Sequence, residues 1–258
     1  MDYINSLENN TIKKIKKLKI KKYREEEQLF IAEGRKFLDF TFEPEIIVFR
    51  ENYEIAGEIE EKLEKFQCRK IIVSEKVFGQ LTSQENSQGV IVVYPYIKGS
   101  LEKLQKNIVV LDKIGDPGNL GTILRAAEGA GISGVIMNME TVDIYNPKVI
   151  RSTMGAVYRL PFVYAKDWAG TLNYLKEQGI RLYAAHLEAE HCYEEEDYTR
   201  GSGFLIGNEG NGLTDETAQM ADSYIKIPMA GKVESLNAAV AASVLMFEAA
   251  RQRRRNKR

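Results

Sequence analysis

Cysteine and histidine are scarce in this chain. Its 258 residues include only two cysteines and two histidines, and Cys68 and Cys192 lack the spacing of metal ligands. So few thiols exclude a disulfide framework, and we expect a reducing compartment in which each cysteine is a buried structural residue. Because no Cys/His cluster is present, a catalytic metal is not expected either.

Long apolar runs are also absent. No stretch approaches the ~20 apolar residues that a membrane-spanning helix needs, and the N-terminus lacks the apolar core of a signal peptide. Hydrophobic residues at 44% and charged residues at 28% are ordinary values for a globular protein. We therefore expect a cytoplasmic protein with no membrane contact, built as one large domain or two modest ones.

The formal net charge of −1 conceals two basic clusters. Seven lysines and one arginine lie between Ile12 and Arg24, and residues 251–258 are mostly arginine. Such clusters favour binding to a phosphate backbone. The alternative is a solvated helix face, because Ile12, Ile15 and Leu18 recur every third residue. Two clusters at opposite ends of a near-neutral chain strengthen the nucleic-acid interpretation.

Apolar periodicity divides the chain into two α/β parts. In the first, short apolar runs predict strands over 46–49, 70–73 and 89–94. Helical spacing predicts helices over 53–66 and 74–81, and Ser74 is a plausible N-cap. The stretch that begins at Pro95 interrupts regular structure and predicts a linker.

The second part alternates apolar and helical segments more clearly. We expect a doubly wound α/β domain with a mainly parallel sheet. Its predicted strands cover 108–111, 135–137, 182–185, 204–206 and 224–227.

Three Gly-containing segments follow apolar runs in this second part. They read DPGNLGTILR over 116–125, IGNEG over 206–210, and IPMAG running into ESLNAA over 227–239. The first segment does not fit the G-x-G-x-x-G pattern of a dinucleotide loop, and no Walker A lysine follows it. Each segment is a weak signal when taken alone.

In this order, the three segments closely resemble the SpoU/TrmH-type RNA ribose 2′-O-methyltransferases of the SPOUT superfamily. The resemblance implies a SPOUT α/β-knot domain over 104–258, in which C-terminal strands and loops form a deep trefoil knot. It also implies, over 1–96, a smaller L30e-like RNA substrate-binding domain with a basic N-terminal helix. The predicted linker between the two domains then covers 97–103. Periodicity alone would not predict the knot, because knots are nearly absent from proteins.

The resemblance assigns catalytic roles to two residues of the first segment. Arg125 matches the family pattern N-x-G-x-x-x-R and would be the main catalytic residue, and Asn119 would hold it or the RNA. A guanidinium keeps its proton at neutral pH. We therefore expect Arg125 to grip the adjacent phosphate and stabilise the developing alkoxide, while the proton acceptor stays open. Without the resemblance, Asn119 would be an N-cap and Arg125 a solvent-facing helical residue.

The other two segments complete the implied active site. Glu209 would orient Arg125 or a ribose hydroxyl, and Ser235 and Asn237 would hydrogen-bond the reacting ribose or its phosphate. A structural Glu209, and a Ser235 that caps the last helix, are the alternatives.

The implied cofactor is S-adenosyl-L-methionine (AdoMet). Apolar side chains would enclose its adenine and a glycine would contact it through the backbone. The residues that the resemblance assigns to this pocket are Leu187, Gly207, Ile227, Met229 and Leu236.

These features together predict an AdoMet-dependent RNA 2′-O-ribose methyltransferase. Ribosomal RNA, and 23S rRNA in particular, is the favoured substrate, because a separate N-terminal domain recurs among rRNA-modifying members of the family. The alternatives are a tRNA ribose methyltransferase of the same family and a non-catalytic RNA-binding assembly factor. Family members usually dimerise through the knotted domain, and the helix over 238–247 is apolar nearly all round, so we expect a homodimer. Burial of this helix within the monomer would explain the same apolar pattern.

Overall fold

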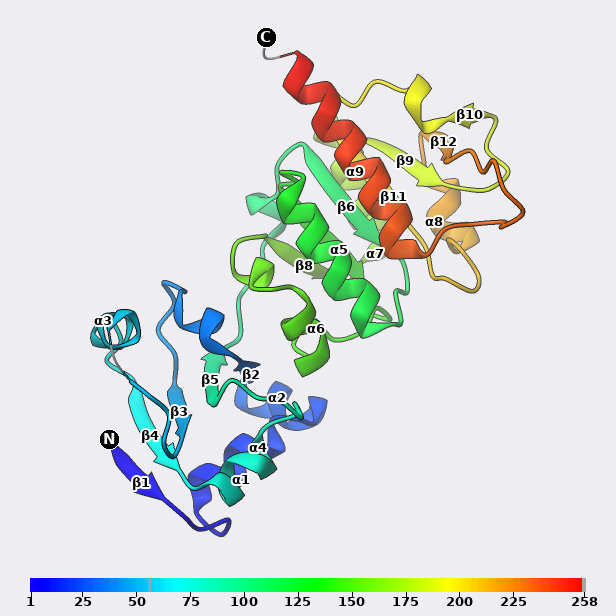
Figure 1. Ribbon diagram of the computed structural model, residues 1–258. Helices are drawn as coiled ribbons and strands as arrows, with labels where there is room; N and C mark the ends of the chain where they lie inside the picture. Colours follow the sequence, from blue (N-terminus) through cyan, green and yellow to red (C-terminus); the bar gives the residue numbers. More distant parts are fainter. Residues whose placement is uncertain (56, 257–258) are drawn as a thin grey trace. The chain divides into compact units, whose positions relative to one another are not determined.

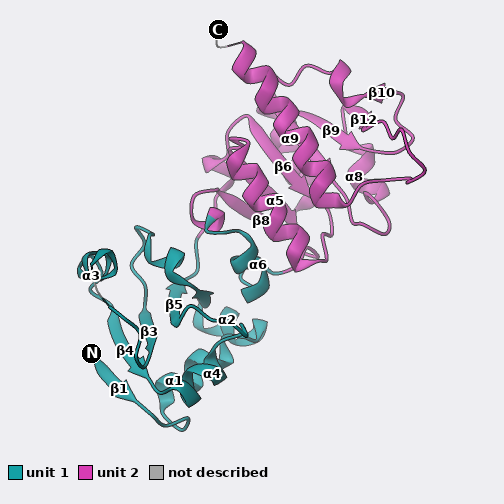
Figure 2. Cartoon of the chain, in the orientation of Figure 1, with its two compact units in different colours: residues 1–97, 143–155 teal, residues 98–142, 156–258 magenta. Residues whose placement is uncertain are grey.

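The computed structural model describes residues 1–55 and 57–256, and they form two compact units (Figure 2). Unit 1 comprises Met1–Ile97 and Asp143–Gly155, and unit 2 comprises Lys98–Val142 and Ala156–Arg258. The chain therefore leaves unit 2 after Val142, contributes thirteen residues to unit 1, and returns. None of the helices in the described ranges combines the length and apolar character that crossing a membrane requires.

Unit 1 is built on a five-stranded sheet with strand order β1-β4-β3-β5-β2. Strands β1, β4 and β3 are parallel, and β5 runs antiparallel to both β3 and β2. The strands are β1 (Asp2–Ile4), β2 (Leu29–Glu33), β3 (Ile46–Arg50), β4 (Arg69–Val73) and β5 (Val90–Pro95). The helices are α1 (Asn10–Lys17), α2 (Lys21–Glu27), the 3-10 helix η1 (Arg35–Leu38), α3 (Glu58–Glu64), α4 (Glu75–Leu81) and α6 (Pro147–Ser152).

The sequence predictions for unit 1 are largely confirmed. The three predicted strands match β3, β4 and β5, and Ser74 caps α4 by accepting a hydrogen bond from the Val77 N–H. The helix predicted over 53–66 is wrong in its first part, because Asn52 and Gly57 have positive φ and α3 begins only at Glu58. Left-handed residues interrupt the right-handed helical path, so the helix starts after the second of them.

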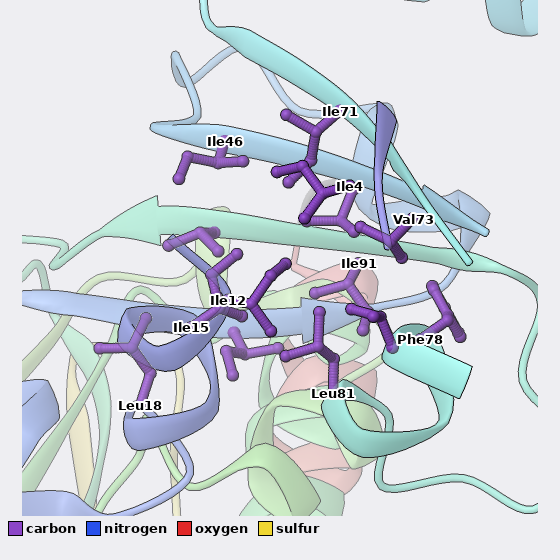
Figure 3. Packing of buried hydrophobic residues seen from close by; sticks show 14 of the residues in the cluster. Ile4, Ile12, Ile15, Leu18, Ile46, Ile71, Val73, Phe78, Leu81 and Ile91 are labelled. Atoms are coloured by element: carbon purple, nitrogen blue, oxygen red, sulfur yellow. The ribbon is translucent and has the colours of Figure 1, made fainter. Parts of the chain in front are cut away.

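The core of unit 1 lies between α1, α4 and one face of the sheet (Figure 3). Ile12, Ile15 and Leu18 are at most 1% exposed, so the spacing of three places the apolar stripe of the first helix on this core. The lysines between them therefore occupy the remaining, solvent-facing surface.

The segment 143–155 is held in unit 1 by polar and aromatic contacts. Arg24 and Asp143 form a buried ion pair at 2.5 Å, and Arg24 also donates to the carbonyls of Leu18 and Lys19. The ring of Tyr145 stacks on that of Tyr96 with centroids 3.8 Å apart. A buried ion pair is tolerated only when further hydrogen bonds satisfy its donors, and Arg24 meets that condition.

Unit 2 contains a wholly parallel seven-stranded sheet with order β10-β12-β9-β11-β6-β7-β8. The predicted mainly parallel α/β domain is therefore confirmed. Its strands are β6 (Asn107–Leu111), β7 (Gly134–Asn138), β8 (Phe162–Ala165), β9 (Arg181–Ala185), β10 (His191–Cys192), β11 (Ser202–Ile206) and β12 (Ser223–Lys226). Its helices are α5 (Pro117–Gly129), α7 (Trp168–Glu177), α8 (Asp215–Gln219) and α9 (Ala238–Arg255), with 3-10 helices η2 (Leu101–Lys103), η3 (Ala156–Tyr158) and η4 (Tyr193–Glu195).

Helices α5 and α9 pack side by side over unit 2's sheet (Figure 1). The apolar stripe predicted for α5 is confirmed, because Leu120, Ile123, Leu124 and Ala127 are fully buried. This packing fixes the N-terminal ends of both helices, where two of the predicted catalytic residues lie. The basic C-terminal cluster is described as far as Arg255, and its members Lys257 and Arg258 lie outside the described residues.

Candidate functional site

Three of the five predicted catalytic residues form a hydrogen-bonded chain in unit 2. The Asn119 side-chain amide donates to Glu209 Oε1, and the Asn237 amide donates to Asn119 Oδ1 at 3.0 Å. These residues are separated by 90 and 118 positions in sequence. The fold therefore brings together residues from all three Gly-containing segments, as the predicted site requires.

Helix capping holds two members of this chain in place. Asp116 caps α5 by accepting from the Asn119 N–H at 2.8 Å, and Pro117 follows at the first helical position, where its missing N–H costs nothing. Asn237 caps α9, its Oδ1 accepting from the Ala239 and Val240 N–H groups. Since that oxygen is occupied by the cap, the amide NH₂ of Asn237 is the group that faces Asn119.

Glu209 lies on a tight turn that follows β11. Asn208 pairs with Gly212 across the turn, and its side-chain amide donates to the Lys113 carbonyl at 3.0 Å. A Cβ on Gly207 would lie only 2.1 Å from the carbonyl carbon of Gly212. Glycine is thus required at 207 by the turn's own backbone, whatever ligand contacts it.

A buried carboxylate anchors the far end of the same turn. Asp112 directly follows β6 and is 1% exposed. Its Oδ1 accepts from the Asn138 amide at 2.7 Å, and its Oδ2 accepts from both the N–H and the hydroxyl of Thr214 at 2.8 and 2.7 Å. Asp112 therefore fixes residue 214, five positions after Glu209, to the end of a central strand.

Asp112 and Asn138 are functional candidates that the sequence reasoning missed. Both are polar residues at the carboxyl end of a buried strand, which is the signal that could have identified them. Thr214 caps α8 and also makes two hydrogen bonds to Asp112.

Among the described residues, neither Arg125 nor Ser235 is hydrogen-bonded to the chain formed by Asn119, Glu209 and Asn237, which we call the Asn119 cluster. Arg125 is exposed on α5, and no carboxylate among the described residues lies within ion-pair distance of it. Ser235 is exposed three positions after Lys232, and Asn237, not Ser235, caps the last helix. The guanidinium of Arg125 is therefore accessible to an external anion, and the catalytic roles of both residues stay predictions.

The residues predicted for the cofactor pocket lie at the carboxyl ends of neighbouring parallel strands. Leu187 follows β9, Gly207 follows β11, and Ile227 and Met229 follow β12. Strands β12, β9 and β11 are adjacent and parallel, so these residues share one edge of the sheet, which is where α/β proteins bind ligands. Leu187 is 63% exposed, and Ile227, Met229 and Leu236 are half-buried.

No metal-binding group accompanies this edge. In the ranges that the structure describes, no cluster of three or more His, Cys, Asp or Glu side chains could hold a metal ion. His186 packs its ring on Tyr224 with centroids 5.4 Å apart, and its Nδ1 accepts from the Glu188 N–H. His186 therefore has a structural role in the loop that follows β9.

Comparison with known proteins places the chain in a family. The model of the SpoU rRNA Methylase family matches residues 106–247, and that of the MRM3-like substrate binding domain matches residues 9–92. The chain belongs to the SpoU rRNA methylase family. The family and the α/β fold class predicted from the three segments are thereby confirmed, and the family's defining match covers every member of the Asn119 cluster.

Individual relatives match over nearly their whole length. The chain is 30% identical to the 23S rRNA (guanosine(2553)-2′-O)-methyltransferase RlmP of Bacillus subtilis, covering 96% of this chain and 98% of that protein. The AdoMet-bound rRNA methyltransferase of Sinorhizobium meliloti superposes with a TM-score of 0.86 at 32% identity, covering 97% of each chain. The SpoU methyltransferase AviRb of Streptomyces viridochromogenes, in complex with AdoMet, superposes with a TM-score of 0.87 at 25% identity, covering 95% of this chain and 98% of AviRb.

Proposed function

We propose that this protein transfers a methyl group from AdoMet to a ribose 2′-oxygen of ribosomal RNA, with 23S rRNA as the substrate. The observation that carries this proposal is the hydrogen-bonded chain of Asn119, Glu209 and Asn237. It supports the proposal because a protein that had lost catalysis would be under no constraint to keep these side chains in mutual contact. Full-length similarity to an rRNA 2′-O-methyltransferase supports the same substrate.

The residues present at the carboxyl edge of the sheet fit AdoMet. Three half-buried apolar side chains, from Ile227, Met229 and Leu236, suit the faces of an adenine ring. Leu187, exposed at the end of β9, would extend this wall. When bound there, AdoMet supplies an electrophilic methyl group on a sulfonium.

The chain's own side chains act on the RNA. Arg125 holds the phosphate next to the reacting ribose and stabilises negative charge on the 2′-oxygen as its proton leaves. Asn119 keeps a fixed orientation, because Asn237 donates to its oxygen while its NH₂ group donates to Glu209. Ser235, exposed two positions before Asn237, hydrogen-bonds the ribose or its phosphate.

The two predicted domains have different functions. Residues 1–96 bind the RNA substrate, residues 97–103 form the linker, and residues 104–258 bind AdoMet and carry the catalytic side chains. The segment 143–155 packs in unit 1, and Lys148 and Arg151 are exposed on its helix α6. We assign these two side chains to RNA phosphates as well.

We further propose that the C-terminal domain contains the family's trefoil knot and forms a homodimer through α9. Two large apolar side chains of this helix, Val240 at 48% and Phe247 at 46%, are exposed within the single chain. A second copy packed on α9 would remove them from water. We also propose the cytoplasm as the protein's compartment, because the full-length relative is a bacterial rRNA-modifying enzyme.

Mapping of 2′-O-methylated nucleotides in total RNA tests the proposal. Cells with and without the gene should differ at a single position in 23S rRNA, and a copy carrying Asn119→Ala should not restore that position. Loss of a tRNA position would move the substrate to tRNA within the same chemistry. An unchanged map in rRNA and tRNA alike would contradict the proposed activity.

A further inference from the structure

One end of unit 1's sheet carries a platform formed by Arg35 and Tyr53. Strand β2 ends before Gly34 and Arg35, β5 begins after Gln88 and Gly89, and β3 ends at Arg50. These strands are neighbours in the sheet, in the order β3-β5-β2 (Figure 1). Three loops therefore meet at the same edge.

Arg35 lies over the ring of Tyr53 at the centre of this platform. Its guanidinium carbon is 5.2 Å from the ring centroid, which is the geometry of a cation–π contact. Arg35 is exposed, and no carboxylate in the described ranges is within ion-pair distance of it. The guanidinium thus lies over an aromatic ring and has no carboxylate partner among the described residues.

The hydroxyl of Tyr53 is unusual in its surroundings. The oxygen is shielded from solvent and has no hydrogen-bond partner among the described residues. Burial raises the pKa of Tyr53, and the charge of Arg35 partly opposes that effect. The Tyr53 side chain is therefore packed beneath Arg35, and the exposed guanidinium is the part of the pair that an external partner can contact.

The platform is rigidly built. Gly34 and Gly89 both have positive φ, at 125° and 77°. A Cβ on Gly34 would lie 2.9 Å from the side-chain oxygen of Gln88, and one on Gly89 would lie 2.9 Å from the Tyr53 ring. The Gln88 oxygen in turn accepts from the Arg35 N–H at 2.8 Å. Both glycines are therefore needed: Gly34 leaves room for the Gln88 side chain, and Gly89 leaves room for the Tyr53 ring.

The lysines of α1 and α2 contrast with this arrangement. Lys13, Lys14, Lys21 and Lys22 each lie within 4 Å of a glutamate carboxylate. Such exposed pairs are weak and can yield to phosphates. Lys17 and Lys22 also lie over the Tyr23 ring, at 5.3 and 6.0 Å from its centroid, but an ammonium has no plane on which a base could stack. Arg35 on Tyr53 offers both charge and a flat surface.

We propose that the Arg35–Tyr53 platform binds an unpaired RNA base, which stacks on the exposed guanidinium of Arg35 while the Tyr53 ring supports that guanidinium from below. Guanidinium planes and aromatic rings are the surfaces on which proteins stack bases released from a helix. Arg50, at the end of β3 and paired with Glu75 only across an exposed 3.5 Å contact, supplies a second cation for the backbone. The inference rests on the proposed RNA-modifying function and specifies which RNA feature unit 1 recognises.

Binding of two defined RNAs to the full chain tests this inference. The probes are a fluorescent hairpin with a loop of six adenosines and a blunt duplex made of its stem, each titrated at several salt concentrations. Arg35→Ala should weaken hairpin binding about 5- to 100-fold, the range expected for one stacked base, and should change duplex binding by less than about threefold. Arg35→Lys should remain weakened, because an ammonium keeps the charge but has no plane to stack on.

Matched variants separate stacking from charge. Lys13→Ala removes one charge elsewhere in the same unit and should reduce the binding of both RNAs equally. Tyr53→Phe, which keeps the ring, should lose less affinity than Tyr53→Leu. Thermal unfolding and AdoMet binding check that each variant is folded.

Equal losses for hairpin and duplex, or an Arg35→Ala variant that binds the hairpin like wild type, would overturn the platform. Failure of the proposed function would give a different result. The wild-type protein would then transfer no methyl group to rRNA, whatever its affinity for the hairpin.

Discussion

Removing the buried carboxylate of Asp112 should destabilise unit 2 and loosen the turn that carries Glu209. In Asp112→Ala, three donors lose their acceptor: the Asn138 amide and the N–H and hydroxyl of Thr214. A hydrogen bond to a charged group contributes about 1.5–3 kcal/mol. Water entering the new space recovers part of this, so we expect a loss of about 3–5 kcal/mol in the free energy of unfolding, as for other buried charged networks.

Urea unfolding followed by circular dichroism measures this loss, and Glu140→Ala is the matched control. Glu140 pairs with Lys113, the residue after Asp112, but that pair is exposed, so its removal should cost less than about 1 kcal/mol. Thr214→Ser keeps the hydroxyl donor and should be near wild type, whereas Thr214→Val should weaken AdoMet binding and stability together. An Asp112→Ala protein within about 1 kcal/mol of wild type would refute the anchoring role.

Three further predictions concern catalysis, RNA affinity and thiol reactivity. Arg125→Ala should reduce methyl transfer at least 100-fold with unchanged AdoMet affinity by calorimetry, and Arg125→Lys should recover little; near-normal turnover would make Arg125 a surface residue. Neutralising Lys13, Lys14, Lys16 and Lys17 together should weaken RNA binding and reduce the slope of log affinity against log salt by about 0.7–0.9 per lost phosphate contact, whereas an unaltered slope would leave α1 as a solvated face. Burial raises the pKa of the Cys68 thiol to about 11. Iodoacetamide should therefore alkylate Cys68 much more slowly at pH 8 in native protein than in unfolded protein. Equal alkylation rates by mass spectrometry would contradict this.

The sequence predicted the elements of the fold better than their long-range contacts. Apolar periodicity located the central strands of both sheets, because buried parallel strands are continuous apolar runs. It missed β8 and the two-residue β10, which lie at the edges of unit 2's sheet. Long-range contacts were not predicted: the ion pair of Arg24 with Asp143 spans 119 positions, and no local pattern reveals it.

The candidate site was predictable where a motif supplied it and hidden where burial decided it. The three segments predicted Asn119, Glu209 and Asn237 as site residues. The fold brings them into one hydrogen-bonded chain, and their catalytic roles stay predictions. Asp112 was overlooked because an aspartate after a strand looks the same in sequence whether its carboxylate is buried or solvated. The roles of Arg125 and Ser235 depend on an RNA ligand, so neither periodicity nor the fold of the single chain determines them.

Transfer of a labelled methyl group from AdoMet to rRNA by the purified protein tests the central claim most directly. The rRNA should be digested to nucleosides after incubation in the presence of a chelator, since the proposed mechanism involves no metal ion. We predict that the label appears in a single 2′-O-methylribonucleoside and that Arg125→Ala and Asn119→Ala abolish it. Label on a base, label that disappears with the chelator, or no label in any rRNA would contradict the account.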